Sequence, residues 1–306
     1  MFDEKETLRV GAAEERTEKR RRAKILWSGF ASSNAVGLLA MVITPFLIGK
    51  LHSLFSLQTS SDVAAVYGVA TFLAIPLAMG IVSAWIWQPL KLTSRQLIEC
   101  SAGNTALAIF GSAFVLREGV ICLAMASLLF FGIIYLGCLL GNKLYERNQR
   151  HVQVSLLPLF ALCLFLDSRS SDTINVVTDE DTIRANPTQV WKNVNSFPPI
   201  TSAPNYWLFK VGMPMPIVSR LHGARVGAKR ECILTGNLVF DERVTVWKPP
   251  QQLTFDIVHQ PEHPELTGHF KLVRGEFRLR ANENGTTTLT GTSWYKLNVR
   301  PLWYFG

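Results

Sequence analysis

Long apolar runs fill the first half of this chain, and alternating apolar and polar positions fill most of the second half. The longest run, Gly119 to Gly141, contains no charged residue. At a rise of about 1.5 Å per residue, roughly 23 residues are enough to cross a hydrocarbon core about 30 Å thick as a helix. A helix of this length in a soluble core would show a polar face, and this run has none. We therefore predict a transmembrane helix over residues 119–141.

Four weaker apolar stretches accompany this run, over residues 25–49, 63–88, 98–116 and 152–166. Together they predict an all-α transmembrane domain over 25–166 with about five spans, preceded by a charged, solvated tail or frayed helix over 1–24. Pro76 should kink the second span. The third is long enough only if its helix begins near Ile98. The fifth either crosses where the bilayer is thin or the helix tilted, or lies at the interface.

Two glycines in the longest run, Gly137 and Gly141, have the GxxxG spacing at which membrane helices approach one another closely. Glycine is common in membrane helices, so this spacing alone is a weak signal.

Basic residues predict the orientation of these spans. The tail carries the KRRRAK run at 19–24, the connection at 91–95 carries two bases, and 143–150 carries three. If all five stretches cross, these segments fall on one side, as the positive-inside rule requires. We therefore expect a multi-pass protein of a bacterial inner membrane, with a cytoplasmic N-terminus and the part after Asp167 on the outer, periplasmic face.

After a short polar linker at 167–173, the pattern changes to the period of β-strands. Asn186, Pro187 and Gln189 are typical of a helix start and predict a helix over 187–195 that buries Val190, Trp191 and Val194. Residues 205–221 contain two prolines and are expected to form a flap or a short helix over a cavity. Turn residues separate an antiparallel meander of strands, predicted over 175–184, 224–234, 238–247, 253–259, 269–281 and 286–299. In the strand over 269–281 the alternation changes phase near Gly275, as a β-bulge would cause.

One strand, a short helical connection and a run of antiparallel strands resemble the START-like (SRPBCC, helix-grip) superfamily, which includes the polyketide cyclase/dehydrase family. The likeness covers residues 174–306 and is carried by four segments: PTQVW at 187–191, GAKRECILTGNLVFDERVTVW at 227–247, RGEFRL at 274–279 and LTGTSWYKLNVRPLWY at 289–304. The segment REGVICLAMA at 117–126 looks like part of the anchor that precedes such a domain in bacterial membrane proteins. The resemblance implies an α+β helix-grip domain with an antiparallel sheet and a ligand cavity.

Members of this superfamily close the sheet with a long C-terminal helix, which forms one wall of the cavity. The sequence stops at Gly306, where that helix should begin. We expect either a truncated sequence or a domain without its lid. An uncovered concave face would expose an apolar patch, so weak ligand retention and low stability are expected.

The candidate cavity residues come from strand alternation combined with this resemblance. Glu242 shares a face with Phe240 and Val244 and is a possible buried carboxylate. The complete candidate set is Trp207, Arg230, Phe240, Glu242, Val244, Arg274, Glu276 and Tyr295. For the charged members, cross-strand ion pairs are an equally good explanation.

Other chemistries find little support in the sequence. His259, His263 and His269 lie near two glutamates, but their spacing matches no zinc motif, and solvated turn residues explain them better. The sequence contains no nucleophile elbow, glycine-rich phosphate loop or HExxH motif. We therefore assign no catalytic residue, metal or cofactor.

The positions of the basic residues and of the cysteines limit which binding partners and which disulfides the sequence supports. Much of the net charge of +8 lies in the run directly before the first apolar stretch, which favours a topology signal over nucleic-acid binding. Four of the five cysteines lie in or beside apolar stretches, so Cys232 has no disulfide partner in the polar half.

We predict a membrane-anchored module that binds an apolar ligand or lipid at the bilayer surface, with membrane lipids and an apolar small molecule as its partners. The first alternative is an enzyme similar to polyketide cyclases or dehydratases, in which an acid such as Glu242 moves protons. The second is a structural cell-envelope protein whose domain docks a partner protein that the sequence does not identify.

Overall fold

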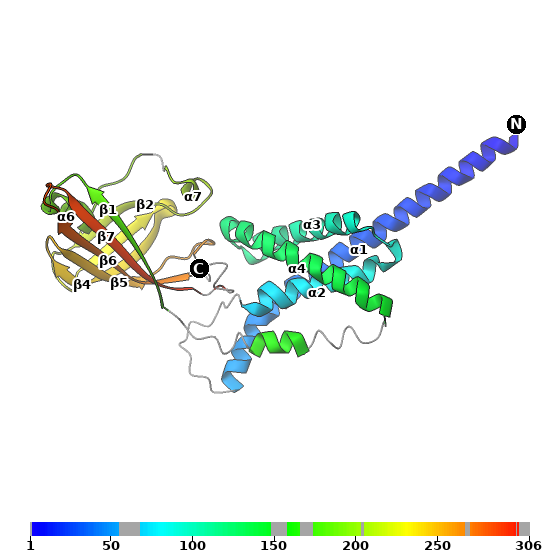
Figure 1. The fold of residues 1–306 in the computed structure, drawn as a ribbon, viewed down its shortest axis with the longest axis horizontal. Coiled ribbons are helices and arrows are strands. Elements are labelled where there is room, and N and C mark those ends of the chain that lie inside the picture. The colour runs from blue at the N-terminus through cyan, green and yellow to red at the C-terminus, as the bar shows by residue number, and fades with distance from the viewer. Residues whose placement is uncertain are drawn as a thin grey trace. The chain divides into compact units, whose positions relative to one another are not determined.

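The computed structural model describes residues 2–54, 68–147, 158–165, 174–202, 205–266, 270–297 and 299. The chain divides into two compact units (Figure 1). Most residues before Ser171 form a helical unit, and Ser171–Gly306 form a unit dominated by one β-sheet. The predicted linker, residues 167–173, lies outside the described residues.

The helical unit contains four described helices that are long and apolar enough to cross a membrane, over Val10–Thr44, Ala70–Leu90, Ser94–Val115 and Val120–Tyr145. They belong to α1 (Phe2–Leu54), η2 with α2 and η3 (Ala70–Ala74, Ile75–Trp87, Gln88–Leu90), α3 with η4 (Ser94–Gly111, Ser112–Leu116), and α4 (Val120–Arg147). Of the fifth predicted span, 158–165 is helical, while 152–157 and 166 lie outside the described residues, as do 63–67 of the second.

Local sequence explains the helix ends and irregularities. The charged tail continues into α1 without a break. α3 begins at Ser94, four residues before Ile98, because Thr93 and Gln96 form a reciprocal capping box. Just before Pro76 the backbone adopts the π-helical turn η2. Proline lacks the N–H that would continue the α-helical hydrogen bonds, and a π-helical turn is one known way for a helix to absorb such an interruption.

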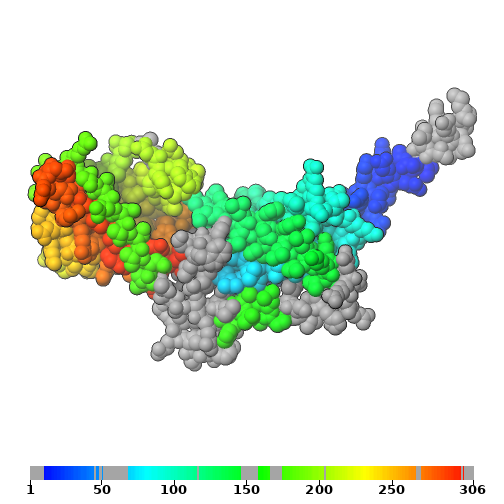
Figure 2. Space-filling view, in the orientation of Figure 1, coloured from blue at the N-terminus to red at the C-terminus, as the bar shows by residue number. Residues whose placement is uncertain are grey.

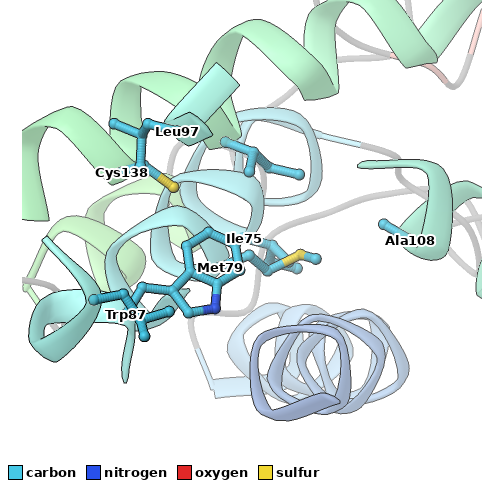
Figure 3. Packing of buried hydrophobic residues seen from close by; sticks show 8 residues of the cluster. Ile75, Met79, Trp87, Leu97, Ala108 and Cys138 are labelled. Carbon is cyan, nitrogen blue, oxygen red and sulfur yellow. The ribbon is translucent and has the colours of Figure 1, made fainter. Parts of the chain in front are cut away.

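An apolar cluster joins α1, α2, α3 and α4 around Trp87 (Figure 3). The Trp87 ring packs edge-on against Phe30 at 5.2 Å between centroids, and its indole Nε1–H donates to the Leu26 carbonyl at 3.1 Å. Its polar N–H is therefore satisfied inside an apolar environment, which lets α1 and α2 pack closely.

α2 and α4 approach at two glycines. A Cβ added to Gly137 would lie 2.4 Å from the Leu77 carbonyl oxygen and 3.1 Å from the Gly80 Cα, so the contact is backbone against backbone. A Cβ added to Gly141 would meet the Ala84 Cβ at 2.6 Å. The GxxxG step thus lies at a helix–helix contact, because only small residues let two backbones come this close.

A buried hydrogen-bond network around Asn104 also crosses the helices. The Asn104 Oδ1 accepts from Ser33 at 2.8 Å and from Asn34 at 2.6 Å, and its Nδ2 donates to Ser83 at 3.0 Å. These groups come from α1, α2 and α3. Because an unpaired polar group in an apolar environment costs several kcal/mol, about 2–7, the network favours one helix arrangement over shifted alternatives.

The C-terminal unit is a seven-stranded antiparallel sheet in the order β1-β7-β6-β5-β4-β3-β2. Its strands are β1 (Ile174–Ile183), β2 (Pro216–His222), β3 (Lys229–Leu234), β4 (Leu238–Lys248), β5 (Gln252–His259), β6 (Phe270–Ala281) and β7 (Thr287–Leu297). From β2 to β7 each strand pairs with the next one along the chain, and β1 closes the sheet beside β7. The predicted antiparallel meander is confirmed.

Helix α6 (Pro187–Asn195) packs on this sheet. The Asn186 side chain accepts from the Gln189 N–H at 2.9 Å, as an N-cap residue does. Val190, Trp191 and Val194 are buried against residues of β4, β5 and β6. The helix and its buried face are those predicted from the sequence.

Two parts of the sheet differ from the sequence-based expectation. Residues 205–221, expected to form a flap or a short helix, contain the short helix α7 (Trp207–Lys210) and most of the edge strand β2 (Pro216–His222). The strand expected to begin at residue 224 begins at Lys229. Pro216 is the first residue of β2, a position where its missing N–H removes no ladder hydrogen bond. The phase change expected near Gly275 is a bulge between Leu272 and Arg274.

Strand β1 forms the other edge and lies along the surface of its unit (Figure 2). Its residues are mostly exposed, including Val176 and Val177 at 56% and 48%. Among the described residues, which end at Val299, no helix follows β7. Ile174, Val176 and Val177 of β1 are thus exposed apolar side chains.

The glycine contact in the helical unit predicts a position-specific effect. Gly137→Val should lower the free energy of unfolding by about 1–3 kcal/mol, because the added methyl groups meet the α2 backbone, which cannot rotate away. Gly132→Val, on the same helix with nothing within 4 Å of an added Cβ, is the matched control. Thermal denaturation of the full chain in detergent compares the two, and equal stability would contradict the close contact.

Candidate ligand cavity

The concave side of the sheet holds a cavity of about 400 Å³. Its apolar lining comes from the segment before β2, from strands β2 to β6 and from the β5–β6 connection: Phe197, Met213, Pro214, Pro216, Leu234, Phe240, Phe255, Ile257, Leu266, Phe270, Leu272 and Phe277. Small-molecule sites in proteins span about 300–1,000 Å³ and are lined in the same way by apolar and aromatic groups. The cavity therefore has the size and lining of a site for a small apolar molecule.

Strand register explains which side chains face the cavity. Arg230 of β3 pairs with Glu242 of β4, and Cys232 pairs with Phe240, so alternate residues of both strands share one face. The same alternation in β5 turns Phe255 and Ile257 toward this face. The lining is therefore a direct consequence of pairing between consecutive strands.

A glycine provides room for an aromatic ring in the cavity wall. Gly275 pairs with Phe255 across β5 and β6, and a Cβ added to Gly275 would lie 2.5 Å from the Phe255 ring. The ring therefore lies across the β6 backbone, where any side chain would displace it. Phe255 is only 6% exposed, so its position is fixed by packing.

Arg230 links the cavity wall to helix α6. Its Nε–H donates to the Asn195 carbonyl at 3.1 Å and its Nη2 to the Val194 carbonyl at 3.4 Å. These carbonyls belong to the last turn of α6, which favours positive charge. The guanidinium also lies 4.7 Å from the centre of the Phe255 ring, a cation–π distance.

The carboxylate of Glu242 is the remaining partner of Arg230. Both side chains are buried, and the Arg230 Nη1 donates to Glu242 Oε2. Oε1 has no hydrogen-bond partner within the described part of the chain, yet it is not closed off from solvent. Burial raises the pKa of Glu242 above its ordinary value of 4.5, against the opposing effect of the Arg230 charge and hydrogen bond. The cavity thus contains one oriented acceptor in an apolar wall.

Cys232 is a second titratable group of the wall. Burial, followed by the nearby Glu242 charge, raises the pKa of its thiol to about 11, although Arg230 opposes the shift. The thiolate is the nucleophilic form of cysteine, so at neutral pH this side chain remains a protonated, poorly reactive thiol.

Arg274 and Glu276 also border the cavity, but they flank Gly275 on β6, so their side chains lie on the opposite face of the sheet. Arg274 pairs with Asp256 at 2.7 Å. Glu276 accepts hydrogen bonds from Thr254, Gln252 and Arg278. Burial alone would raise the pKa of Glu276, but these donors together hold it below its ordinary value. Cross-strand pairing, the alternative considered from the sequence, accounts for both side chains.

The eight sequence-predicted cavity residues therefore fall into three groups. Arg230, Phe240 and Glu242 lie together on the concave wall, and Arg274 and Glu276 border it through β6. Within the described residues, Trp207, Val244 and Tyr295 are not part of the lining. Their role as ligand contacts, for all eight, stays a prediction.

The structure explains why Trp207, Val244 and Tyr295 do not line the cavity. Val244 shares the face of Glu242, but α6 covers that part of the sheet and buries it. Tyr295 lies on β7 beyond Gly291, Thr292 and Ser293, the residues of that strand that border the cavity. Trp207 lies on the short helix α7 (Trp207–Lys210) and is 60% exposed.

Sequence reasoning missed Phe255, Ile257 and Gly275. The alternation of Leu253, Phe255 and Ile257 was a usable signal for the first two, because β5 was predicted as a strand between two cavity strands. The role of Gly275 in making room for a ring could not be predicted from the local sequence, because it depends on which residue of β5 lies opposite Gly275.

A metal site finds no support among the described residues, which contain no group of three or more histidine, cysteine, aspartate or glutamate side chains able to hold an ion. His269, one of the histidines considered above, lies outside them.

No protein-family model and no curated protein matches the chain. Solved structures match its C-terminal part. Norcoclaurine synthase from Thalictrum flavum, in complex with dopamine and hydroxybenzaldehyde, is 9% identical, covering 42% of this chain and 72% of that chain at a TM-score of 0.28. Major latex-like protein 151 from Panax ginseng is 13% identical, and the match covers 43% of this chain and 87% of that chain at a TM-score of 0.30. The protein XoxI from Bacillus cereus is 19% identical, and the match covers 41% of this chain and 77% of that chain at a TM-score of 0.28.

The fold itself is decided by topology. One strand precedes a helix that packs on the concave face, and six sequential antiparallel strands follow and return the last strand to the first. This arrangement is the one that the sequence resemblance implies. The C-terminal unit is thus an α+β domain in which one seven-stranded antiparallel sheet packs against α6.

Proposed function

We propose that the C-terminal unit binds an apolar molecule carrying one hydrogen-bond donor, next to the membrane that holds the helical unit. The observation that carries this proposal is the apolar cavity of about 400 Å³ with the Glu242 Oε1 as an unpaired acceptor in its wall. Apolar burial at about 25 cal/mol per Å² supplies most of the affinity. The carboxylate orients the molecule, because a donor left unpaired against it would lose a charge-assisted hydrogen bond.

The lipids of the surrounding bilayer are the first candidate source of such a molecule. Four described helices have the length and hydropathy to cross a bilayer, and they are part of the same chain. An apolar molecule dissolved in that bilayer is therefore concentrated near the unit that would bind it.

A proton-transfer enzyme is the second candidate. It is favoured by the burial that raises the pKa of Glu242, since a carboxyl group titrating nearer neutral pH is a better general acid or base. In this role Arg230 would be a positioning residue that fixes the carboxyl group, and the unpaired Oε1 would exchange the proton with the bound molecule.

We further propose the topology predicted from basic residues, with five spans and the C-terminal unit on the outer face. The basic segments at 19–24, 91–95 and 143–150 support it, because five crossings leave all three on one side.

Filling the cavity should weaken binding. Ile257→Trp directs a larger ring into the cavity and removes roughly 60 Å² of apolar contact, which at about 25 cal/mol per Å² weakens binding about tenfold. Val258→Trp, one residue further and 61% exposed on the opposite face, is the matched control. Native mass spectrometry of the full chain in detergent counts adducts of the probe N-phenyl-1-naphthylamine. Equal adducts in both variants, or none in the wild type, would overturn the proposal.

The two buried glutamates should affect stability with opposite pH dependence. The raised pKa of Glu242 means that its contribution is complete below pH 4.5 and is lost as the pH rises through the folded-state value. The lowered pKa of Glu276 means that its contribution is complete above pH 4.5 and is lost as the pH falls.

Calorimetry of the full chain tests this contrast. The Tm of wild type minus that of Glu242→Gln should decrease from pH 4.5 toward neutral pH. The corresponding difference for Glu276→Gln should decrease as the pH falls below 4.5. A Glu242 difference that increases toward neutral pH would show that the Arg230 charge outweighs burial.

Reporter fusions test the topology. Alkaline phosphatase fused after Ser171 should be active, because it folds only outside the cytoplasm, whereas the same reporter fused after Lys91 should be inactive. An inactive enzyme at Ser171, with the fusion protein present at normal level, would place the C-terminal unit in the cytoplasm.

A further inference from the structure

An aromatic cluster lies beside the cavity and takes no part in the site described above. Tyr206 contacts Phe209 edge-on at 5.8 Å between ring centroids, and contacts Trp207 at 6.5 Å. Tyr206 and Trp207 are 56% and 60% exposed, and α7 has no buried residue. We call residues 205–211 the aromatic segment.

The aromatic segment is followed along the chain by Met213 and Pro214 of the cavity wall. Its helix α7 is labelled beside β2 in Figure 1. The Met213 N–H donates to the Leu208 carbonyl at 3.1 Å, which ties the wall to α7. Met213 and Pro214 line the cavity, and Met213 packs against the cluster of Leu234, Phe240 and Leu266. A molecule that contacts the aromatic segment is therefore next to the cavity.

The composition of the segment differs from that of a water-facing loop. The sequence Tyr206 to Val211 reads YWLFKV, with Val211 46% exposed and a single charge, Lys210. Surface connections are usually rich in glycine, proline and small polar residues. Tyrosine and tryptophan, by contrast, are enriched at membrane–water interfaces, where the ring meets apolar chains and the polar atom stays hydrated. A lysine at the edge of such a cluster is attracted to anionic headgroups.

A short tether joins the C-terminal unit to the helical unit. The last described helical residue before β1 is Phe165, and β1 begins at Ile174. The eight residues between these points, 166–173, extend at most about 28 Å. The C-terminal unit is thus covalently tethered near the membrane that its own helical unit occupies.

We propose that the aromatic segment docks on the lipid headgroup region of that bilayer, with Tyr206 and Trp207 inserted among the headgroups. The occupant is the bilayer because the chain itself supplies it at tether distance and because the exposed groups are those that such an interface takes up. Resting on the proposed function, the inference adds the route: the apolar molecule passes between the bilayer and the cavity along Met213, without crossing water.

Site-specific photocrosslinking tests the docking. The full chain is reconstituted in nanodiscs of phosphatidylethanolamine and phosphatidylglycerol, with p-benzoylphenylalanine in place of Trp207. The matched control carries it in place of Val226, which is also 60% exposed and lies in the turn between β2 and β3. Mass spectrometry of the irradiated peptides should find lipid adducts at position 207 and none at 226. Equal adducts at both positions, no lipid adduct at 207, or adducts to a second copy of the chain would overturn the proposal.

A transfer measurement separates this inference from the proposed function. Trp207→Ser should slow the uptake of N-phenyl-1-naphthylamine from lipid vesicles and leave its adducts at equilibrium unchanged, since Trp207 is outside the cavity lining. Val226→Ser should change neither. Lipid adducts at position 207 in a chain that binds no probe would contradict the proposed function and support docking on the bilayer. Probe binding by Trp207→Ser with an unchanged rate of uptake from vesicles would contradict the proposed route between the bilayer and the cavity.

Discussion

Arg230 is the point on which the C-terminal unit depends, because its guanidinium bonds the last carbonyls of α6, the carboxylate of Glu242 and the face of Phe255 at once. Removing one partner of a buried ion pair typically costs about 3–5 kcal/mol, since the other charge is left uncompensated. Arg230 therefore links the helix, the sheet and the cavity wall, in addition to the apolar contacts of Val190, Trp191 and Val194. The same bond uses one oxygen of Glu242 and leaves the other to the cavity, so the contact that stabilises the fold also orients its candidate acceptor.

The helical unit solves a related problem in an apolar environment. Burial of apolar surface gives little preference among helix arrangements when the surrounding lipid is equally apolar. Close backbone contact at Gly80 and Gly137 and the hydrogen bonds of Asn104 provide that preference instead. Both units thus use a few buried polar or small residues to select one packing from many that are equally apolar.

These features suggest why an anchored domain and an apolar cavity occur in one chain. A molecule that dissolves in lipid reaches a soluble binding site slowly through water. A site tethered to the bilayer by a short linker, with aromatic side chains beside its cavity, shortens that path. In the proposed function, Glu242 distinguishes molecules with a donor group from purely apolar lipid chains, because only the former donate a hydrogen bond to its Oε1.

The sequence by itself determined most of the elements, β2 excepted, because both signals are local: a run such as 119–141 has no charge to place in water, and alternation with capping at Asn186 specifies strands and α6. It also carried the resemblance that implied the order of helix and strands. Tertiary structure decided the site. Pairing placed Gly275 under Phe255 and turned Arg274 and Glu276 to the opposite face, while α6 covered Val244. Those outcomes depend on which residues of distant strands lie opposite one another, and periodicity along one strand carries no information about its neighbour's register.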